Sequence, residues 1–233
     1  MSKTVVITGA NRGLGLELAR AYAGRGDQVI AGCRTPATAT DLGAVTPHID
    51  QLDVGDERSI RAFVDSLGGR SIDIVINNAG IDARNLGVAD GDRDVLTLSP
   101  EHMIQQIRVN AIGPMLLARG LVPNLRRSDS PKIINMSSQI GSMVVSAGMG
   151  RDAGYAVSKA ALNMITVKLA ARLKDDGIIV IALHPGYLRT AMGGAGAPLG
   201  ADESASALVQ LVDGLTINET GSFKRWDATD HPW

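Results

Sequence analysis

A short apolar segment near the start of the chain leads through glycines into a helical pattern. Residues 3–8 are mostly β-branched and apolar, which is typical of a buried strand, and residues 16–22 repeat apolar side chains at helical spacing. The turn between them reads Gly9-Ala10-Asn11-Arg12-Gly13-Leu14-Gly15. The first N–H groups of the helix that follows such a turn have no partner within the helix, and the positive end of the helix dipole lies there. An anion can therefore bind at the turn. The segment therefore predicts an α/β fold with a phosphate-binding site.

The spacing of the three glycines narrows the kind of ligand. Glycine allows the tight turn, the close approach of backbone to a pyrophosphate, and the close packing of helix on strand. The pattern is T-G-x-x-x-G-x-G rather than the G-x-G-x-x-G of other dinucleotide folds. An ordinary strand-to-helix turn is the alternative, but the position at the start of a strand–helix–strand unit favours a nucleotide.

Strands and helices are expected to alternate along the rest of the chain. Apolar runs predict strands at residues 28–33, 47–54, 72–77, 132–138, 178–183 and 222–226. Helical patterns cover residues 56–67, 100–127, 155–173 and 202–212, the longest bent near Gly113-Pro114, with a short, weak helix ending at Leu42. This alternation predicts one parallel sheet covered by helices on both faces, in a single doubly wound α/β domain over residues 1–233.

Composition excludes several classes of protein. The 233 residues carry a formal net charge of −1, which gives no electrostatic reason to expect nucleic acid or an anionic membrane as partner. Cys33 is the only cysteine, so we expect no disulfide within the chain, no metal site and a reducing compartment. We find no signal-peptide pattern and no apolar run of the roughly 18–20 residues that span a bilayer. We therefore expect a cytoplasmic protein.

The end of the second strand bears on which dinucleotide is preferred. NAD sites usually carry Asp or Glu there, to bind the ribose 2′-hydroxyl. Here Cys33 and Arg34 occupy the tip, and Arg12 lies inside the glycine turn. Each guanidinium can pair with a 2′-phosphate, at about 1.5–3 kcal/mol for a charge-assisted bond. The pattern favours NADP(H), with solvated surface arginines as the alternative.

Two further strand ends carry residues suited to a nucleotide. Asp53-Val54 ends the third strand, where a carboxylate can accept a hydrogen bond from an adenine amine. Asn77-Asn78-Ala79-Gly80 ends the fourth, where amides can tie neighbouring strands together and glycine lets a ligand approach the backbone. An Asp-capped turn and a plain polar turn are the alternatives.

A serine, a tyrosine and a lysine form a candidate reactive set. Tyr155 and Lys159 are four residues apart and share a face of the predicted helix, although such pairs are also common on helix surfaces. An ammonium beside a phenol favours phenolate, so we expect Lys159 to lower the pKa of Tyr155 and make it a proton donor or acceptor. Ser138, or its neighbour Ser137, can hydrogen-bond the same substrate oxygen. Asn110 is polar within an apolar stretch; bending the helix or holding a water behind Lys159 would explain it, and an exposed Asn is the alternative.

Taken in order, the motifs resemble those of the short-chain dehydrogenase/reductase (SDR) family over essentially the whole chain. They are T-G-A-N-R-G-L-G, D-V, N-N-A-G, the helical Asn, the strand-five Ser, Y-x-x-x-K and P-G-x-x-x-T. The resemblance implies the sheet order 3-2-1-4-5-6-7 and a catalytic tetrad of Asn110, Ser138, Tyr155 and Lys159. Ser138 is chosen over Ser137 because the family's catalytic serine is the second of such a pair.

The resemblance also implies an NADP(H) site. Lys159 would hold the nicotinamide ribose, and the loop after the sixth strand would border the nicotinamide amide and the pyrophosphate. The residues expected to bind the cofactor are Thr8, Gly9, Asn11, Arg12, Gly13, Leu14, Gly15, Arg34, Asp53, Val54, Asn78, Ala79, Gly80, Tyr155, Lys159, Pro185, Gly186, Tyr187 and Thr190.

A finer resemblance is to the branch of sniffer-type carbonyl reductases and C-factor proteins, which is mostly NADPH-linked. It depends on the opening motif, on Gly32-Cys33-Arg34 and on His231-Pro232-Trp233. The segment between Ser138 and Tyr155 is longer than is common, and the substrate loop at about residues 187–201 is short and rich in Gly and Ala. We expect a mobile or open substrate entrance lined by Met143, Val144, Val145, Met149, Tyr187 and Met192, with core filling as the alternative for the methionines.

Three functions remain open from the sequence. The first is an NADPH-dependent oxidoreductase that reversibly reduces a ketone or aldehyde to an alcohol, with Tyr155 as acid/base. The second, suggested by the C-factor resemblance, is a nucleotide-binding regulatory protein with little turnover; the third is a dehydratase or epimerase. The helices that start at Pro100 and Tyr155 are the family's usual dimer faces, so a homodimer or homotetramer is expected.

Overall fold

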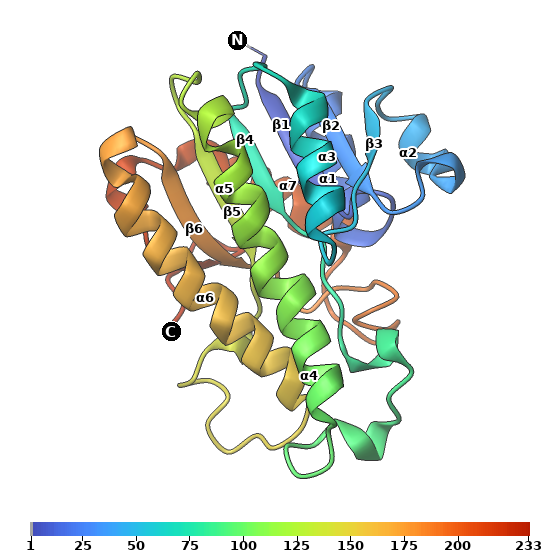
Figure 1. The fold of residues 1–233 in the computed structure, drawn as a ribbon. Coiled ribbons are helices and arrows are strands. Elements are labelled where there is room, and N and C mark those ends of the chain that lie inside the picture. Colours follow the sequence, from blue (N-terminus) through green and yellow to red (C-terminus); the bar gives the residue numbers. More distant parts are fainter. Residues whose placement is uncertain (1) are drawn as a thin grey trace.

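The computed structural model describes residues 2–233 and contains a seven-stranded sheet in the order β3-β2-β1-β4-β5-β6-β7 (Figure 1). All six neighbouring pairs are parallel. The strands are β1 (Thr4–Thr8), β2 (Gln28–Cys33), β3 (Ile49–Gln51), β4 (Ile74–Asn77), β5 (Lys132–Met136), β6 (Ile179–His184) and β7 (Phe223–Arg225). The expected fold class and strand order are confirmed.

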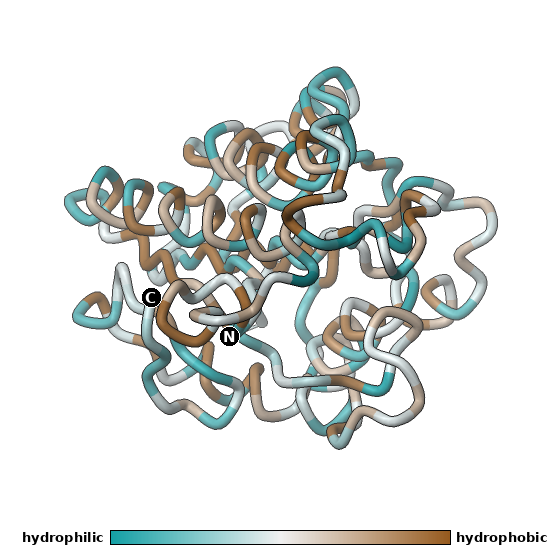
Figure 2. Tube along the Cα trace, turned by 90° about the horizontal axis from the view of Figure 1, so that it is seen from below, coloured by the Kyte–Doolittle hydropathy of each residue, from teal (hydrophilic) through white to brown (hydrophobic). Residues whose placement is uncertain are grey.

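Helices cover both faces of the sheet because alternate strand residues point to opposite sides. Val5 and Ile7 of β1 pack in the cluster with α1 (Gly13–Gly24), α2 (Thr40–Gly43) and α7 (Ala201–Gly214). Val6 packs in the other cluster, with α3 (Glu57–Leu67), α5 (Gly113–Leu125) and α6 (Ala153–Leu173). Figure 2 shows hydrophobic and hydrophilic residues alternating along the helices, as one-sided burial requires.

The third strand is shorter than the predicted range of residues 47–54. Leu52 N–H still donates to Cys33 O at 2.8 Å, but Asp53 N–H turns away to Ser59 Oγ at 2.9 Å. The Asp53 carboxylate then accepts from Gly55 N–H at 2.8 Å, and the chain turns toward Asp56, whose carboxylate caps α3. This local hydrogen bonding ends the strand early.

The long central helix is irregular next to the predicted bend rather than at it. It begins as α4 (Pro100–Ile107), capped by Ser99, and passes through a π-helical turn (Arg108–Ile112) before α5. At Gly113 the helix meets the turn after β3 so closely that a Cβ would lie 2.2 Å from Val54 O. The π turn contains Asn110, so the irregularity coincides with a candidate site residue.

The carboxyl ends of the parallel strands all lie at one edge of the sheet, at the bottom of Figure 1. The segments that follow β1, β4, β5 and β6 gather there, and they include the glycine turn, residues 78–98, residues 137–152 and residues 185–200. Among the described residues, no helix is long and apolar enough to cross a membrane. Ligands of open α/β sheets bind at this edge, which locates the candidate site.

Candidate active site

The glycine turn is packed too closely for side chains. Gly9 has a φ of +64°, its N–H donates to Gly32 O at 2.8 Å, and a Cβ there would lie 3.0 Å from Ala79 Cα. A Cβ on Gly15 would lie 2.3 Å from Gly9 O. The backbone at the N-terminus of α1 is therefore free of covering side chains, as a diphosphate cradle needs.

Thr8 and Asn78 hold this turn in place. Thr8 Oγ1 accepts from the N–H groups of Asn78 and Ala79, both at 3.0 Å. The Asn78 side-chain amide donates to Thr8 O at 2.9 Å and to Gly9 O at 3.2 Å. Both polar side chains are thus bonded to the backbone at the ends of β1 and β4. They therefore influence a bound ligand by fixing the shape of the turn.

The loop after β6 reaches the glycine turn at Thr190. A Cβ on Gly13 would lie 3.5 Å from Thr190 Cγ2, and Thr190 Oγ1 accepts from Gly193 N–H at 3.1 Å. Pro185 O accepts from Ser204 Oγ at 2.6 Å. Gly186 has a φ of +96° and packs on Leu199 and Trp226. The structure therefore brings Pro185, Gly186, Tyr187 and Thr190 to the edge of the predicted site, Tyr187 with its ring exposed.

Two arginines, Arg34 after β2 and Arg12 in the glycine turn, are exposed to solvent. Arg12 and Arg34 are exposed and neither forms an ion pair with any residue from 2 to 233, while Cys33 is buried. Asn11 is also exposed, whereas Leu14 packs in the core. Asp53 forms the capped turn described above, through Oδ1. The surface therefore carries unpaired positive charge where a 2′-phosphate is expected.

Lys159 is buried at the centre of the site, with 3% of its surface exposed. Its ammonium donates to Met136 O at 2.7 Å and lies 5.5 Å from the centroid of the Tyr155 ring. A Cβ on Gly80 would lie 3.6 Å from Lys159 Nζ. Desolvation by burial lowers the pKa of Lys159 to about 8.

The expectation that Lys159 lowers the pKa of Tyr155 is not met in the protein alone. Burial raises the pKa of Tyr155 well above its ordinary value, and the negative charge of Asp82 adds to the increase. A side-chain hydrogen bond with Ser138 and the charge of Arg84 oppose it. Desolvation outweighs the charge effects, so the phenol is held protonated.

The two neighbouring serines have different surroundings. Ser137 is buried, and its hydroxyl donates to Asn163 Oδ1 at 2.6 Å in the interior of α6. Ser138 is partly exposed two residues beyond β5, and its hydroxyl acts to lower the pKa of the nearby Tyr155 phenol. The geometry thus gives Ser137 a structural partner and directs Ser138 toward the tyrosine.

Asn110 is fully buried and ties the π turn to the loop after β4. Its Oδ1 accepts from Ile81 N–H at 2.8 Å, and its Nδ2 donates to Ile81 O at 2.7 Å and to Ser158 Oγ at 2.9 Å. Ser158 Oγ in turn donates to Tyr155 O at 2.7 Å. Asn110 therefore braces the backbone on both sides of the reactive set, and the exposed-Asn alternative is wrong.

Sequence reasoning missed a contact across the mouth of the site. Arg84, in the loop after β4, pairs with Asp82 and donates to the main-chain oxygen of Met192 in the substrate loop. Within that loop Arg189 N–H donates to Leu199 O at 2.9 Å. The entrance is bridged by Arg84.

Four of the side chains predicted to line the entrance are exposed, so core filling does not describe them: Met143, Val144, Met149 and Tyr187.

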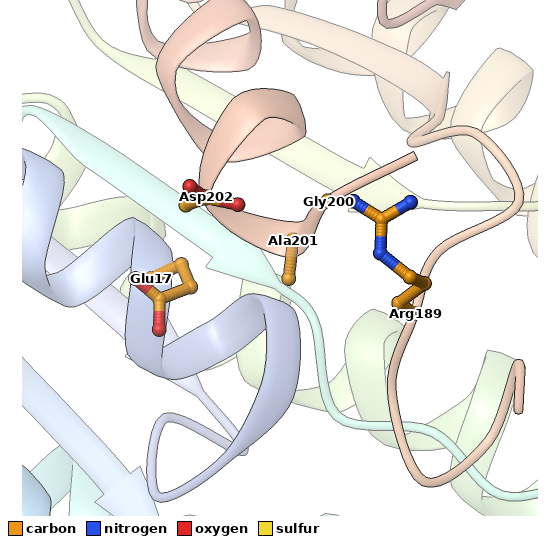
Figure 3. A pocket seen from close by; sticks show the side chains of 5 residues that line it. All are labelled: Glu17, Arg189, Gly200, Ala201 and Asp202. Carbon is orange, nitrogen blue, oxygen red and sulfur yellow. The ribbon is translucent and has the colours of Figure 1, made fainter. Parts of the chain in front are cut away.

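A separate pocket of about 350 Å³ borders the outer side of the substrate loop. Figure 3 shows it between Glu17 of α1, Arg189 of the loop, and Gly200, Ala201 and Asp202 at the start of α7. It contains none of the reactive residues. No group of three or more His, Cys, Asp or Glu residues suited to a metal occurs within residues 2–233.

The doubly wound fold, the glycine cradle and the Ser138–Tyr155–Lys159 group define a nucleotide-binding α/β oxidoreductase. The family model for short chain dehydrogenase matches residues 3–197, and the chain belongs to this family. Among curated relatives, C-signal of Myxococcus xanthus is 33% identical over 174 residues, which are 75% of this chain and 100% of that protein.

Solved structures support membership of the sniffer branch. The carbonyl reductase Sniffer of D. melanogaster has a TM-score of 0.90 and 27% identity, with 100% of both chains covered. The NADPH-bound carbonyl reductase from chicken fatty liver has a TM-score of 0.89 and 29% identity, covering 100% of this chain and 99% of that one.

Proposed function

We propose that the protein is an NADPH-dependent carbonyl reductase that reversibly converts a ketone or aldehyde to an alcohol. The observation that carries the proposal is the meeting of Ser138, a protonated Tyr155 and a buried Lys159 at the edge where the glycine cradle opens. A carbonyl reductase with this fold has been crystallised with NADPH. The exposed pair Arg12 and Arg34 suits the extra phosphate of that cofactor.

The residues present fit the cofactor. The cradle formed by Gly9, Gly13 and Gly15 would hold the diphosphate, and Asp53 and Val54 border the place expected for adenine. Ala79 and Gly80, with Pro185 to Thr190, complete the edge on the nicotinamide side, where Lys159 would hold the ribose. When bound, NADPH supplies the hydride that reaches the carbonyl carbon.

The chain's own residues supply the proton and the orientation. The Ser138 hydroxyl donates a hydrogen bond to the substrate oxygen as negative charge develops on it. Tyr155, held protonated by burial, gives its proton to that oxygen, and in the reverse direction it accepts one. Asn110 fixes the backbone near Tyr155 through Ser158, and we expect it also to hold a proton-relay water behind Lys159.

Turnover with a panel of aldehydes and ketones tests this function directly. We expect NADPH to be consumed with at least one carbonyl compound and NADH to be a poorer cofactor. Faster turnover with NADH would contradict the assignment of Arg12 and Arg34. Net oxidation of NADPH also argues against a dehydratase or epimerase, because neither consumes the cofactor.

The similarity to C-signal favours a second candidate, a nucleotide-binding regulatory protein. It predicts tight NADPH binding with no turnover of any carbonyl compound. The intact reactive set argues against it, since a protein that only binds a nucleotide has no need to bury a lysine beside a tyrosine.

We also propose that two copies associate through α4, the π turn and α6. Ile104, Ile112, Val157 and Met164 are large apolar residues on these elements, each at least 40% exposed. Burying them against a second copy would remove that surface from water. Light scattering coupled to size-exclusion chromatography distinguishes a dimer or tetramer from a monomer.

A further inference from the structure

Residues 230–233, here called the strap, are bound to the last strand by aromatic packing. The His231 ring meets Phe223 of β7 edge-on, with centroids 4.7 Å apart, and the Trp233 ring lies over the same Phe223 at 5.3 Å. His231 N–H also donates to Phe223 O at 2.8 Å. These contacts fix the direction of the strap relative to the sheet.

The strap reaches the segment that follows Ser138. Trp233 O accepts from Ser142 Oγ at 3.1 Å and from Val144 N–H at 3.4 Å. Figure 1 shows the end marked C beside this segment. The last residue of the strap therefore holds residues 142–144, a few positions after the proposed oxygen-binding serine.

The same segment touches the reactive lysine. A Cβ on Gly141 would lie 2.7 Å from Lys159 Cβ, and Gly141 O accepts from Asn163 Nδ2 at 3.1 Å. Beyond Ser142, the side chains of Met143 and Val144 are 74% and 67% exposed. A shift of this segment would move both Ser138 and an apolar wall of the substrate entrance.

We infer that Trp233, packed with His231 on Phe223, is a positioning residue for the carbonyl substrate and acts through residues 142–146. This inference rests on the proposed function. The strap forms no hydrogen bond, ion pair or aromatic contact with the glycine turn, Arg12 or Arg34. These residues follow β1 and β2, whereas the strap packs on β7 at the far side of the sheet. Its loss should therefore weaken substrate binding and leave cofactor binding unchanged.

Trp233→Ala tests the inference, with Trp233→Phe as the conservative variant. Losing the aromatic pair with Phe223 should raise the KM for the carbonyl compound about 2- to 10-fold. Trp233→Phe should restore the KM, and the NADPH dissociation constant should stay within about 2-fold of the wild-type value in both. Asp230→Asn is the matched control: it removes the neighbouring surface ion pair with Lys224 and should change neither quantity.

His231 has an analogous pair of variants. His231→Ala removes the ring that packs edge-on against Phe223, whereas His231→Phe keeps an aromatic ring there. If this packing holds the strap in place, His231→Ala should lower kcat/KM with NADPH affinity unchanged, and His231→Phe should recover part of it. Unchanged KM and kcat/KM in Trp233→Ala and His231→Ala, or equal weakening of NADPH and carbonyl binding, would overturn the inference.

Amide hydrogen exchange provides a readout that does not depend on turnover. Trp233→Ala should accelerate exchange in a peptide that covers residues 142–146, because loss of the ring packing on Phe223 loosens the main-chain oxygen of residue 233, which accepts from Val144 N–H. Exchange at the glycine turn should not change. If the wild-type protein reduces no carbonyl compound, the proposed function is wrong. The exchange rate then decides alone whether the strap holds residues 142–146, and an unchanged exchange rate in Trp233→Ala would show that it does not.

Discussion

Lys159 Nζ donates a 2.7 Å hydrogen bond to the main-chain oxygen of Met136, the last residue of β5. The bond joins the second turn of α6 to the strand that ends just before Ser137 and Ser138. A single contact therefore fixes the lysine and the serine relative to each other. It also gives the buried ammonium a hydrogen-bond acceptor, which lowers the cost of burying its charge.

Replacing this lysine should stop the reaction. Lys159→Met removes the charge with little change in length, and we expect kcat for NADPH-dependent reduction to fall by about 10²-fold or more. Lys168→Met changes an exposed lysine of the same helix and serves as the control. Both proteins should retain the wild-type circular dichroism. A kcat within twofold of wild type in Lys159→Met contradicts the role.

The pH dependence of reduction should follow Lys159. Its pKa is lowered to about 8, so the ammonium is charged below that pH and neutral above it, whereas the raised pKa of Tyr155 keeps the phenol protonated through the neutral range. Reduction should therefore be level below about pH 8 and decline at higher pH. Initial rates at saturating NADPH between pH 6 and about 10 measure this. A rate that climbs as the pH passes 8 is incompatible with these assignments.

The two arginines should set the choice of cofactor. Arg34→Ala, and separately Arg12→Ala, should lower the ratio of NADPH to NADH kcat/KM by about 10-fold, since each loses one charge-assisted bond at an exposed site. Arg34→Asp should lower it further by repelling the 2′-phosphate. Arg70→Ala, an exposed arginine before β4, is the control. If all four proteins keep the wild-type ratio, Arg12 and Arg34 do not bind the 2′-phosphate.

The bridge from Arg84 to Met192 should control substrate entry. Arg84→Ala removes the bond to the substrate loop, so we expect a KM for the carbonyl compound about 3- to 10-fold higher and faster amide exchange in residues 190–196. Arg119→Ala removes an exposed arginine of α5 and should be neutral. Slower exchange or a lower KM in Arg84→Ala would show that the bridge hinders binding instead.

The fold and the centre of the site were predictable because their determinants are local. The β-branched runs specify strands buried on both faces, and Gly9 and Gly15 occupy places where any Cβ would clash. The family pattern selects Ser138 over Ser137. The physical reason is that the Ser137 hydroxyl is already used: it donates a hydrogen bond to Asn163, which lies one helical turn beyond Lys159.

Other features depend on contacts between residues far apart in sequence. The π turn forms where Asn110 binds both backbone groups of Ile81, and no local pattern encodes that partner. The bond from Arg84 to Met192 spans 108 positions, and the contact of Ser142 with Trp233 spans 91. The pKa of Tyr155 was predicted in the wrong direction because helical spacing reveals the neighbouring charge and not the extent of burial.

The central claim is that Tyr155 gives the proton to the substrate oxygen. The most direct measurement is the rate of NADPH oxidation by Tyr155→Phe with a carbonyl compound that the wild-type protein reduces, together with NADPH affinity by fluorescence titration. If Tyr155 is the proton donor, kcat should be at least about 10²-fold lower, with the NADPH dissociation constant within about 2-fold of wild type. Wild-type turnover by Tyr155→Phe would contradict it.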